Sequence, residues 1–210
     1  MDAFDALSYK DSKGDFNSKD EELLIDLLHS DRNPDWLLDI GCGDGLLTRR
    51  VKATLPDTRI IAIDNSSTQI EIASENSVQG IEFMHAGIET FSSERVFDCA
   101  YSFYAFPHMP KSNLPMALKA VRSVLDTDAK FYLFTNVALF DTGLIPEDEQ
   151  EACSITFLDG FSSQINLTSL HEMKSLFAQA DLTVVRDEQL ETGANVKDYG
   201  DMISWLFVLQ

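Results

Sequence analysis

The chain has 210 residues, 44% of them hydrophobic, which is enough to build a single domain, spanning residues 1–210, around a substantial core. Its 35 acidic and 16 basic residues give a net charge of -19 at pH 7, spread along the sequence, so nucleic acid is not an expected partner. The three scattered cysteines and the short apolar segments indicate no disulfide framework, metal site, signal peptide or membrane span, so we expect a cytoplasmic protein.

The chain begins with a helix and then alternates strands and helices. A stripe of leucines predicts the helix near residues 21–29, and a longer N-terminal segment, residues 1–30, is a candidate cap over the site. Strands are predicted near residues 35–41, 59–64, 81–85, 96–103 and 129–136, and helices near 45–55, 67–76 and 111–125. This alternation indicates crossover connections and a parallel sheet.

The C-terminal part follows a different pattern. We expect a helix near 168–179, a strand at Leu182–Arg186, a polar loop at Asp187–Gly200 and a last strand at Ile203–Leu209. Two strands with no helix between them favour antiparallel pairing. The predicted fold is therefore α/β, a doubly wound and mostly parallel seven-stranded sheet with an antiparallel last strand and helices on both faces.

The most informative motif lies between the first strand and its helix. Glycines recur at Gly41, Gly43 and Gly45, so the backbone there can turn tightly and approach a ligand at a helix start. The dinucleotide fingerprint needs a further glycine where this chain has Leu46, which disfavours a nicotinamide oxidoreductase. Alone, such a loop is also compatible with a purely structural turn.

Two acidic residues accompany the loop. Asp39 precedes it, and Asp64 ends the next strand at the spacing from which a carboxylate reaches a ribose. The combined pattern resembles the class I methyltransferases, which use S-adenosylmethionine. The resemblance implies that the loop faces the methionine part of the cofactor, that Asp64 bonds the ribose, and that Asp39 orders the loop and the amino end of the cofactor. For Asp39, simple capping of backbone N–H groups is the alternative.

The sequence departs from this family pattern after the third strand. Many members have an acidic residue there that bonds the adenine amino group, but this chain has Gly87. We therefore expect backbone groups and Ile88 to hold the adenine.

Ligands of doubly wound sheets bind beyond the carboxyl ends of the strands, and four strand ends carry candidate residues. With Tyr9, which the resemblance places over the cofactor, and Gln69, the expected cofactor-binding set is Tyr9, Asp39, Gly41, Cys42, Gly43, Asp64, Asn65, Gln69, Gly87, Ile88, Ser102 and Phe103.

His108 is the candidate catalytic residue. It follows the fourth strand, where small-molecule methyltransferases often have a histidine, and imidazole can take a proton from an acceptor near neutral pH. A packed or cofactor-touching histidine is the alternative. Tyr104 and Phe106 are candidate substrate-binding residues, with core packing as the alternative.

Residues 137–166 form a long segment without clear periodicity, which is typical of a substrate lid. Phe157 and Phe161, four residues apart, are candidates to lie above the pocket. The acidic run at 147–151 is equally compatible with a solvated surface.

The leading hypothesis is transfer of a methyl group from S-adenosylmethionine, which leaves S-adenosylhomocysteine, to an O, N or S atom of a small molecule. A cofactor-binding or regulatory protein without transfer activity, and a protein methyltransferase, are the alternatives. The sequence does not identify the acceptor or the oligomeric state.

Overall fold

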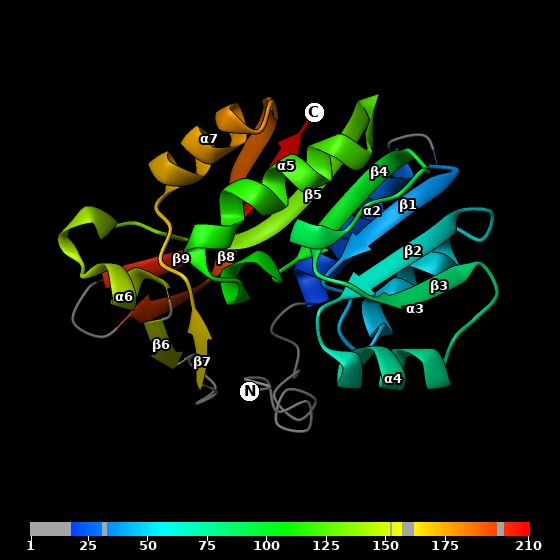
Figure 1. The fold of residues 1–210 in the computed structure, drawn as a ribbon, viewed down its shortest axis with the longest axis horizontal. Coiled ribbons are helices and arrows are strands. Elements are labelled where there is room, and N and C mark those ends of the chain that lie inside the picture. The colour runs from blue at the N-terminus through cyan, green and yellow to red at the C-terminus, as the bar shows by residue number, and fades with distance from the viewer. Residues whose placement is uncertain (1–17, 31–32, 152, 157–161, 197–199) are drawn as a thin grey trace.

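The computed structural model describes residues 18–30, 33–151, 153–156, 162–196 and 200–210. Within these ranges the chain builds one seven-stranded sheet, in the order β3-β2-β1-β4-β5-β9-β8, and one two-stranded sheet, β6-β7 (Figure 1). The large sheet contains β1 (Trp36–Ile40), β2 (Arg59–Asp64), β3 (Ile81–His85), β4 (Phe97–Phe103), β5 (Leu125–Ala138), β8 (Val184–Val196) and β9 (Gly200–Leu209). Strands β1 to β5 pair in parallel, and β9 is antiparallel to both β5 and β8. The predicted fold class is confirmed.

Five of the six described α-helices fall where the sequence predicts them, to within one turn, and the short helix α6 was not predicted. The six are α2 (Ser18–Ser30), α3 (Leu46–Thr54), α4 (Ser67–Glu75), α5 (Leu114–Val124), α6 (Glu147–Glu151) and α7 (Leu170–Gln179). Their ends carry ordinary start signals: Ser66 caps α4, and Ser169 with Glu172 forms a capping box on α7. None of the described helices has the length and apolar character needed to cross a membrane.

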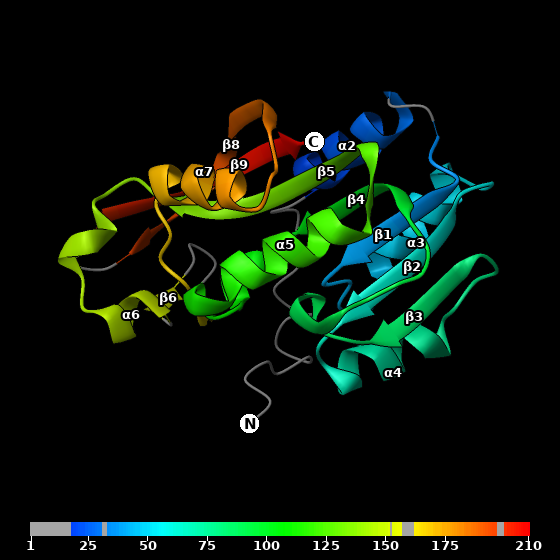
Figure 2. The same cartoon turned by 45° about the horizontal axis from the view of Figure 1, so that its top comes forward.

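Apolar side chains cover both faces of the sheet. Helices α5 and α7 lie side by side across one face, whereas α2 and α3 cover the other (Figure 2). Consecutive residues of β1 divide between the two cores, because Leu37 faces α2 and α3 while Leu38 faces α5. Burial on both sides explains why the central strands are continuous apolar runs. The packing on both faces also sets the positions of the strand ends that carry the site.

The predicted polar loop at Asp187–Gly200 is wrong over most of its length, because β8 continues from Val184 to Val196. This strand lies at the edge of the sheet, where polar side chains face water, so apolar alternation does not reveal it. Its pairing with β9 also shifts register between Gln189 and Gly193. The fifth strand likewise starts earlier than predicted, at Leu125.

The segment 137–166 contains more regular structure than its sequence suggests. After the end of β5 come the short 3-10 helix η4 (Thr142–Leu144), helix α6, and the antiparallel strands β6 (Cys153–Thr156) and β7 (Ser162–Ile165). Of the residues expected near the substrate or cofactor, Tyr9, Phe157 and Phe161 lie outside the described residues.

Candidate active site

The strand order reverses between β1 and β4, and the region beyond these strand ends is called the crevice below, because doubly wound sheets bind their ligands there. From β1 the chain proceeds to β2 and β3 on one side, and from β4 it proceeds to β5 on the other, so the two turns diverge. The turn after β1 contacts the turn after β4, because a Cβ built on Gly41 would lie 2.1 Å from the Cβ of Ala105. The glycine loop and the turn that carries His108 are therefore direct neighbours.

The three glycines of the loop have different roles. All have left-handed backbones, with φ of 78° at Gly41, 54° at Gly43 and 72° at Gly45, which side-chain-bearing residues rarely adopt. A Cβ on Gly45 would lie 2.6 Å from the Phe83 ring, whereas one on Gly43 would meet nothing within 4 Å. At Gly41, Ala105 fills the space on the side where a side chain would lie. Only Gly43 has open space there.

Asp64 faces the loop. Its Oδ2 accepts a hydrogen bond from the Gly43 N–H at 2.8 Å, and its Oδ1 accepts one from the Ser66 N–H at 2.9 Å. Burial raises the pKa of Asp64, while the two backbone bonds and the charges of His85 and His108 lower it. Each carboxylate oxygen has a second lone pair, so the group can also accept a ligand hydroxyl. Asp64 thus combines loop support with a polar surface in the crevice.

Asp39 lies beneath the loop and is only 2% exposed. Its Oδ2 accepts hydrogen bonds from Thr48 of α3 at 2.6 Å and from Tyr101 of β4 at 2.5 Å. Burial raises the pKa of Asp39 to about 7, although the hydrogen bonds from Thr48 and Tyr101 lower it. The negative charge of Asp64 contributes a smaller increase. The alternative of capping backbone N–H groups receives no support, since both recorded partners are hydroxyls. Asp39 joins β1, α3 and β4 under the loop.

Three other expected cofactor residues are largely buried. The Ser102 hydroxyl donates to the Ile40 carbonyl at 2.9 Å, and the residue has no exposed surface, so it joins β1 to β4. Ile88 is 3% exposed and packs in the core with Phe91, which corrects the expectation that its side chain holds adenine. Gln69 is 7% exposed in the first turn of α4. The half-buried Cys42 and Phe103 and the exposed Asn65 stay at the crevice edge.

A carboxylate does reach the end of β3, from two residues further along. A Cβ built on Gly87 would lie 2.9 Å from Oε2 and 3.1 Å from Cδ of Glu89. Glu89 therefore folds back over the glycine, and the missing side chain of Gly87 leaves the space that it needs. Glu89 thus places a carboxylate beside Gly87, the position where the sequence lacks an acidic residue.

His108 ends the short 3-10 helix η2 (Phe106–His108). Its Nδ1 lies 3.3 Å from the Gln164 carbonyl and 3.3 Å from the Ser163 hydroxyl. Burial lowers the pKa of His108, whereas the hydrogen bond with Gln164 and the charge of Asp64 raise it less. Part of the side chain is nevertheless exposed to solvent. A ring crowded by protein yet open to water on one side is typical of a crevice wall. His108 and Asp64 thus interact electrostatically across the ends of β4 and β2.

The remaining aromatic candidates divide between crevice and core. Tyr104 has φ 56°, a strained value held in place by a bond from its N–H to the Phe134 carbonyl and one from its hydroxyl to Asp20 of α2. It is half-buried and packs edge-on against Phe103. Phe106 is 1% exposed and packs against Phe131, so its assignment to the substrate pocket is wrong.

Comparison with known proteins supports the resemblance seen in the sequence. The sequence model of a family described as methyltransferase domain matches residues 37–128. The fold also matches a Burkholderia thailandensis 1,6-didemethyltoxoflavin-N1-methyltransferase crystallised with 1,6-didemethyltoxoflavin and S-adenosylhomocysteine, with a TM-score of 0.64, 16% identity, and coverage of 96% of this chain and 83% of that one. This chain is therefore similar to methyltransferases in the sequence of residues 37–128 and in its fold.

Two curated relatives extend the comparison. Malonyl-[acyl-carrier protein] O-methyltransferase from Halalkalibacterium halodurans is 35% identical over 79 residues, 34% of this chain and 29% of the relative. Release factor glutamine methyltransferase from Enterococcus faecalis is 27% identical over 176 residues, 78% of this chain and 62% of the relative. This chain thus spans less than two thirds of the length of either methyltransferase.

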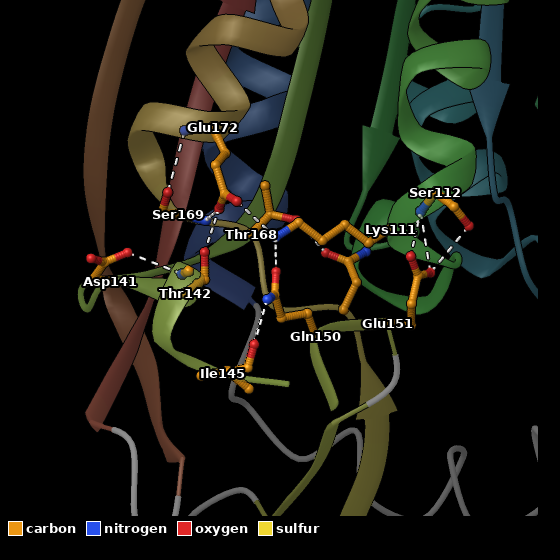
Figure 3. A network of polar contacts seen from close by, with 12 residues as sticks. Lys111, Ser112, Asp141, Thr142, Ile145, Gln150, Glu151, Thr168, Ser169 and Glu172 are labelled. Carbon is orange, nitrogen blue, oxygen red and sulfur yellow. Dashed lines mark hydrogen bonds and ion pairs between the residues drawn. The ribbon is translucent and has the colours of Figure 1, made fainter. Parts of the chain in front are cut away.

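A second polar cluster joins η4 and α6 to the 3-10 helix η3 (Lys111–Asn113) and to α7 (Figure 3). Lys111 of η3 donates to Gln150 of α6 and to Glu172 of α7, both at 2.8 Å. Ser112 donates to Glu151, so part of the acidic run is bonded rather than only solvated. Burial would raise the pKa of Glu172, but bonds from Lys111, Thr142 and Ser169 outweigh it and lower the pKa to about 2. This cluster is the Lys111 network below.

Sequence reasoning missed Glu89, Asn166 and the Lys111 network. The signal for Glu89 was available, because it follows Gly87 by two residues in the turn after β3. Asn166 and Lys111 carry no motif, since their partners are tens of residues away. Among the described residues, no group of three or more histidine, cysteine or acidic side chains is arranged to hold a metal ion.

Proposed function

We propose that this protein is a cytoplasmic methyltransferase that moves a methyl group from S-adenosylmethionine to an O, N or S atom of a small molecule. The observation that carries the proposal is the bond between Asp64 and Gly43 beside the open space of the glycine loop. A carboxylate at the end of β2 and a bare backbone at the end of β1 are the two features a nucleoside needs there.

The residues present fit this cofactor. Asp64 would accept hydrogen bonds from the ribose hydroxyls, and the main chain at Gly43 would face the methionine part. Glu89 and the backbone at Gly87 would accept a hydrogen bond from the adenine amino group, which donates only. When bound, the sulfonium cofactor supplies an electrophilic methyl group.

His108 would act on the acceptor. Its ring would take the proton that the acceptor atom loses on methylation. The lowered pKa keeps the imidazole neutral, and so able to take a proton, at neutral pH. Alignment of acceptor and methyl group alone can supply roughly 7–11 kcal/mol, so the base adds to a reaction driven mainly by positioning. Phe103 and Tyr104 stand at the same strand end and would line the acceptor side.

A protein acceptor is the second candidate. The match to release factor glutamine methyltransferase over 78% of this chain favours it. The net charge of -19 favours a small molecule or a basic protein over nucleic acid. The Kd for the cofactor does not distinguish these two acceptors, and a regulatory protein that only binds the cofactor would also bind it, so a transfer assay is needed.

The test is transfer of labelled methyl from S-adenosylmethionine into a cell extract, followed by separation of low-mass compounds from acid-precipitated protein. Label in a low-mass compound is the expected result. Label in protein alone would overturn the small-molecule proposal, and no transfer despite tight S-adenosylhomocysteine binding would indicate a regulatory protein. An Asp64→Ala variant, assayed in parallel, controls for transfer by contaminating enzymes.

A further inference from the structure

The four residues 163–166, which end β7 and begin the next connection, hold the turn that carries His108. Asn166 is the centre of this contact. Its side-chain Nδ2 lies 2.8 Å from the carbonyl oxygen of Phe106, 3.2 Å from that of Pro107 and 2.9 Å from that of Met109. Its backbone N–H donates to the Pro107 carbonyl at 2.7 Å. The carbonyls on both sides of His108 are therefore bonded to one residue.

The orientation of the Asn166 amide follows from its partners. Backbone carbonyls only accept hydrogen bonds, so the NH₂ end must face the turn. The Oδ1 end in turn accepts from the Thr168 hydroxyl at 2.8 Å. Asn166 is 4% exposed and Thr168 is fully buried, so water does not compete for these bonds. A buried and fully bonded amide is a rigid support for an irregular turn.

The same segment also contacts the imidazole ring. Nδ1 of His108 lies 3.3 Å from the Gln164 carbonyl, which cannot donate. A hydrogen bond there requires the proton on Nδ1, and in the neutral ring this leaves Nε2 as the basic nitrogen. Ser163 lies equally close to Nδ1, so its hydroxyl adds a second polar contact on that side. The backbone position and the tautomer of His108 thus depend on one stretch of chain about 56 residues away.

We propose that Asn166 is a positioning residue for His108, which it holds so that Nδ1 faces Gln164 and Nε2 serves as the base. The inference rests on the proposed function only for the role of Nε2, since the contacts themselves need no ligand. It also gives the segment 137–166 a specific role, because the end of this segment sets the geometry of the proton acceptor.

The test measures the ring directly. In the full chain labelled with ¹⁵N-histidine, the Nδ1 and Nε2 shifts of His108, assigned with a His108→Gln variant, report the tautomer at a pH where the ring is neutral. We expect the Nδ1–H form to predominate in the wild type and to become the minority in Asn166→Ala. Asn136→Ala is the matched control, because it also removes an asparagine side-chain bond, to Ser204 in the sheet, and should leave the ring unchanged.

Thr168→Val provides a second, milder variant if Asn166→Ala does not fold. It keeps the shape of the side chain but removes the bond to Asn166, so a smaller shift in the same direction is expected. A wild-type ring protonated on Nε2, or a folded variant of Asn166 or Thr168 with the wild-type tautomer, would overturn the inference.

A cofactor titration separates this inference from the proposed function. The Kd for S-adenosylhomocysteine should change less than about twofold in these variants, because the altered bonds are outside the glycine loop. Loss of S-adenosylhomocysteine binding in the wild type, with the tautomer as described, would contradict the proposed function and leave the positioning role intact. A large change of Kd in Thr168→Val would show that the segment supports the cofactor site instead.

Discussion

The two sides of the crevice are built from different kinds of contact. On the side of β1 and β2, main chain without side chains meets one carboxylate, as in the bond from Gly43 to Asp64. On the side of β4, side chains from distant segments hold the main chain, as Asn166 does for the turn at Phe106–His108. The first arrangement depends on backbone conformations that few residue types adopt, whereas the second depends on ordinary polar residues.

The comparison indicates that the two sides of the crevice differ in how many residue types each could accept. Left-handed glycines and a buried acid leave little freedom for substitution, because any side chain at Gly41 or Gly45 would clash. Networks such as the one around Lys111 can be rebuilt with many side chains, provided that each buried group keeps a partner. The predictions below test whether the two sides are in fact separable.

The largest effect is expected at Asp64. Replacement by alanine removes a charged acceptor of ribose hydroxyls and the bond that shapes the loop at Gly43, so the Kd for S-adenosylhomocysteine should rise by roughly 100-fold or more. Isothermal titration measures it. Asp57→Ala, at the exposed opposite end of β2, is the control and should bind normally. Equal affinity in both variants would show that Asp64 does not bind the cofactor.

His108 should affect transfer without affecting cofactor affinity. In His108→Gln the rate of methyl transfer should fall by about 100-fold, while the Kd for S-adenosylhomocysteine stays near the wild-type value. His171→Gln, on the surface of α7, is the control. The wild-type rate should decline on acidification only below the ordinary pKa of 6.5, because the pKa of His108 is lowered and protonation removes the base. An unchanged rate in His108→Gln would leave positioning alone as the source of catalysis.

Glu89 should determine selectivity for the base. The wild type should prefer S-adenosylhomocysteine over its inosine analogue, which has a carbonyl oxygen in place of the amino group, by about tenfold. Glu89→Ala should lose this preference, whereas Glu82→Ala, an exposed residue of β3, should retain it. Competition titrations with the two compounds provide the measurement. A preference that survives in Glu89→Ala would assign adenine recognition to the backbone alone.

The smallest effect concerns the Lys111 network and appears as a pH dependence of stability. Since the pKa of Glu172 is about 2 in the fold, its bonds stabilise the protein above the ordinary carboxyl pKa of 4.5, and this contribution is lost as the pH falls toward 2. Lys111→Met should therefore lower the free energy of unfolding by about 1 kcal/mol at pH 6 and by less at pH 3, a modest value because Glu172 is partly exposed.

Urea unfolding at the two pH values measures this difference. Lys174→Met is the matched control, because Lys174 lies on the same helix as Glu172 and pairs with Asp187 of β8. Lys174 is more exposed than Lys111, so its loss should cost less at pH 6. The same loss at both pH values in Lys111→Met would show that packing, rather than the ion pair, accounts for the effect.

The parts of the fold that the sequence predicts well are those with a strict local requirement. Continuous apolar runs located the central strands and a stripe of leucines located α2, because these elements bury apolar faces. The strand predicted at Leu182–Arg186 located only the start of β8, since the rest of this edge strand needs no such face. The spacing of Asp64 from the glycines was informative because only one geometry brings a strand-end carboxylate to the loop.

The rest of the site depends on contacts that no local pattern encodes. Phe106 is as aromatic as Tyr104, yet it packs in the core while Tyr104 stays half-buried at the strand end. Whether a side chain at a strand end turns inward depends on the elements packed over it. The same holds for Asn166, whose role appears only once β7 lies beside η2.

The central claim is that the open space at Gly43, facing Asp64, is the cofactor cradle. Titration of the full chain with S-adenosylhomocysteine, followed through the backbone amide signal of Gly43, tests it most directly. The account predicts that this signal shifts and saturates with one molecule bound per chain. Saturable binding that leaves the Gly43 amide unmoved, or no binding at all, would contradict it.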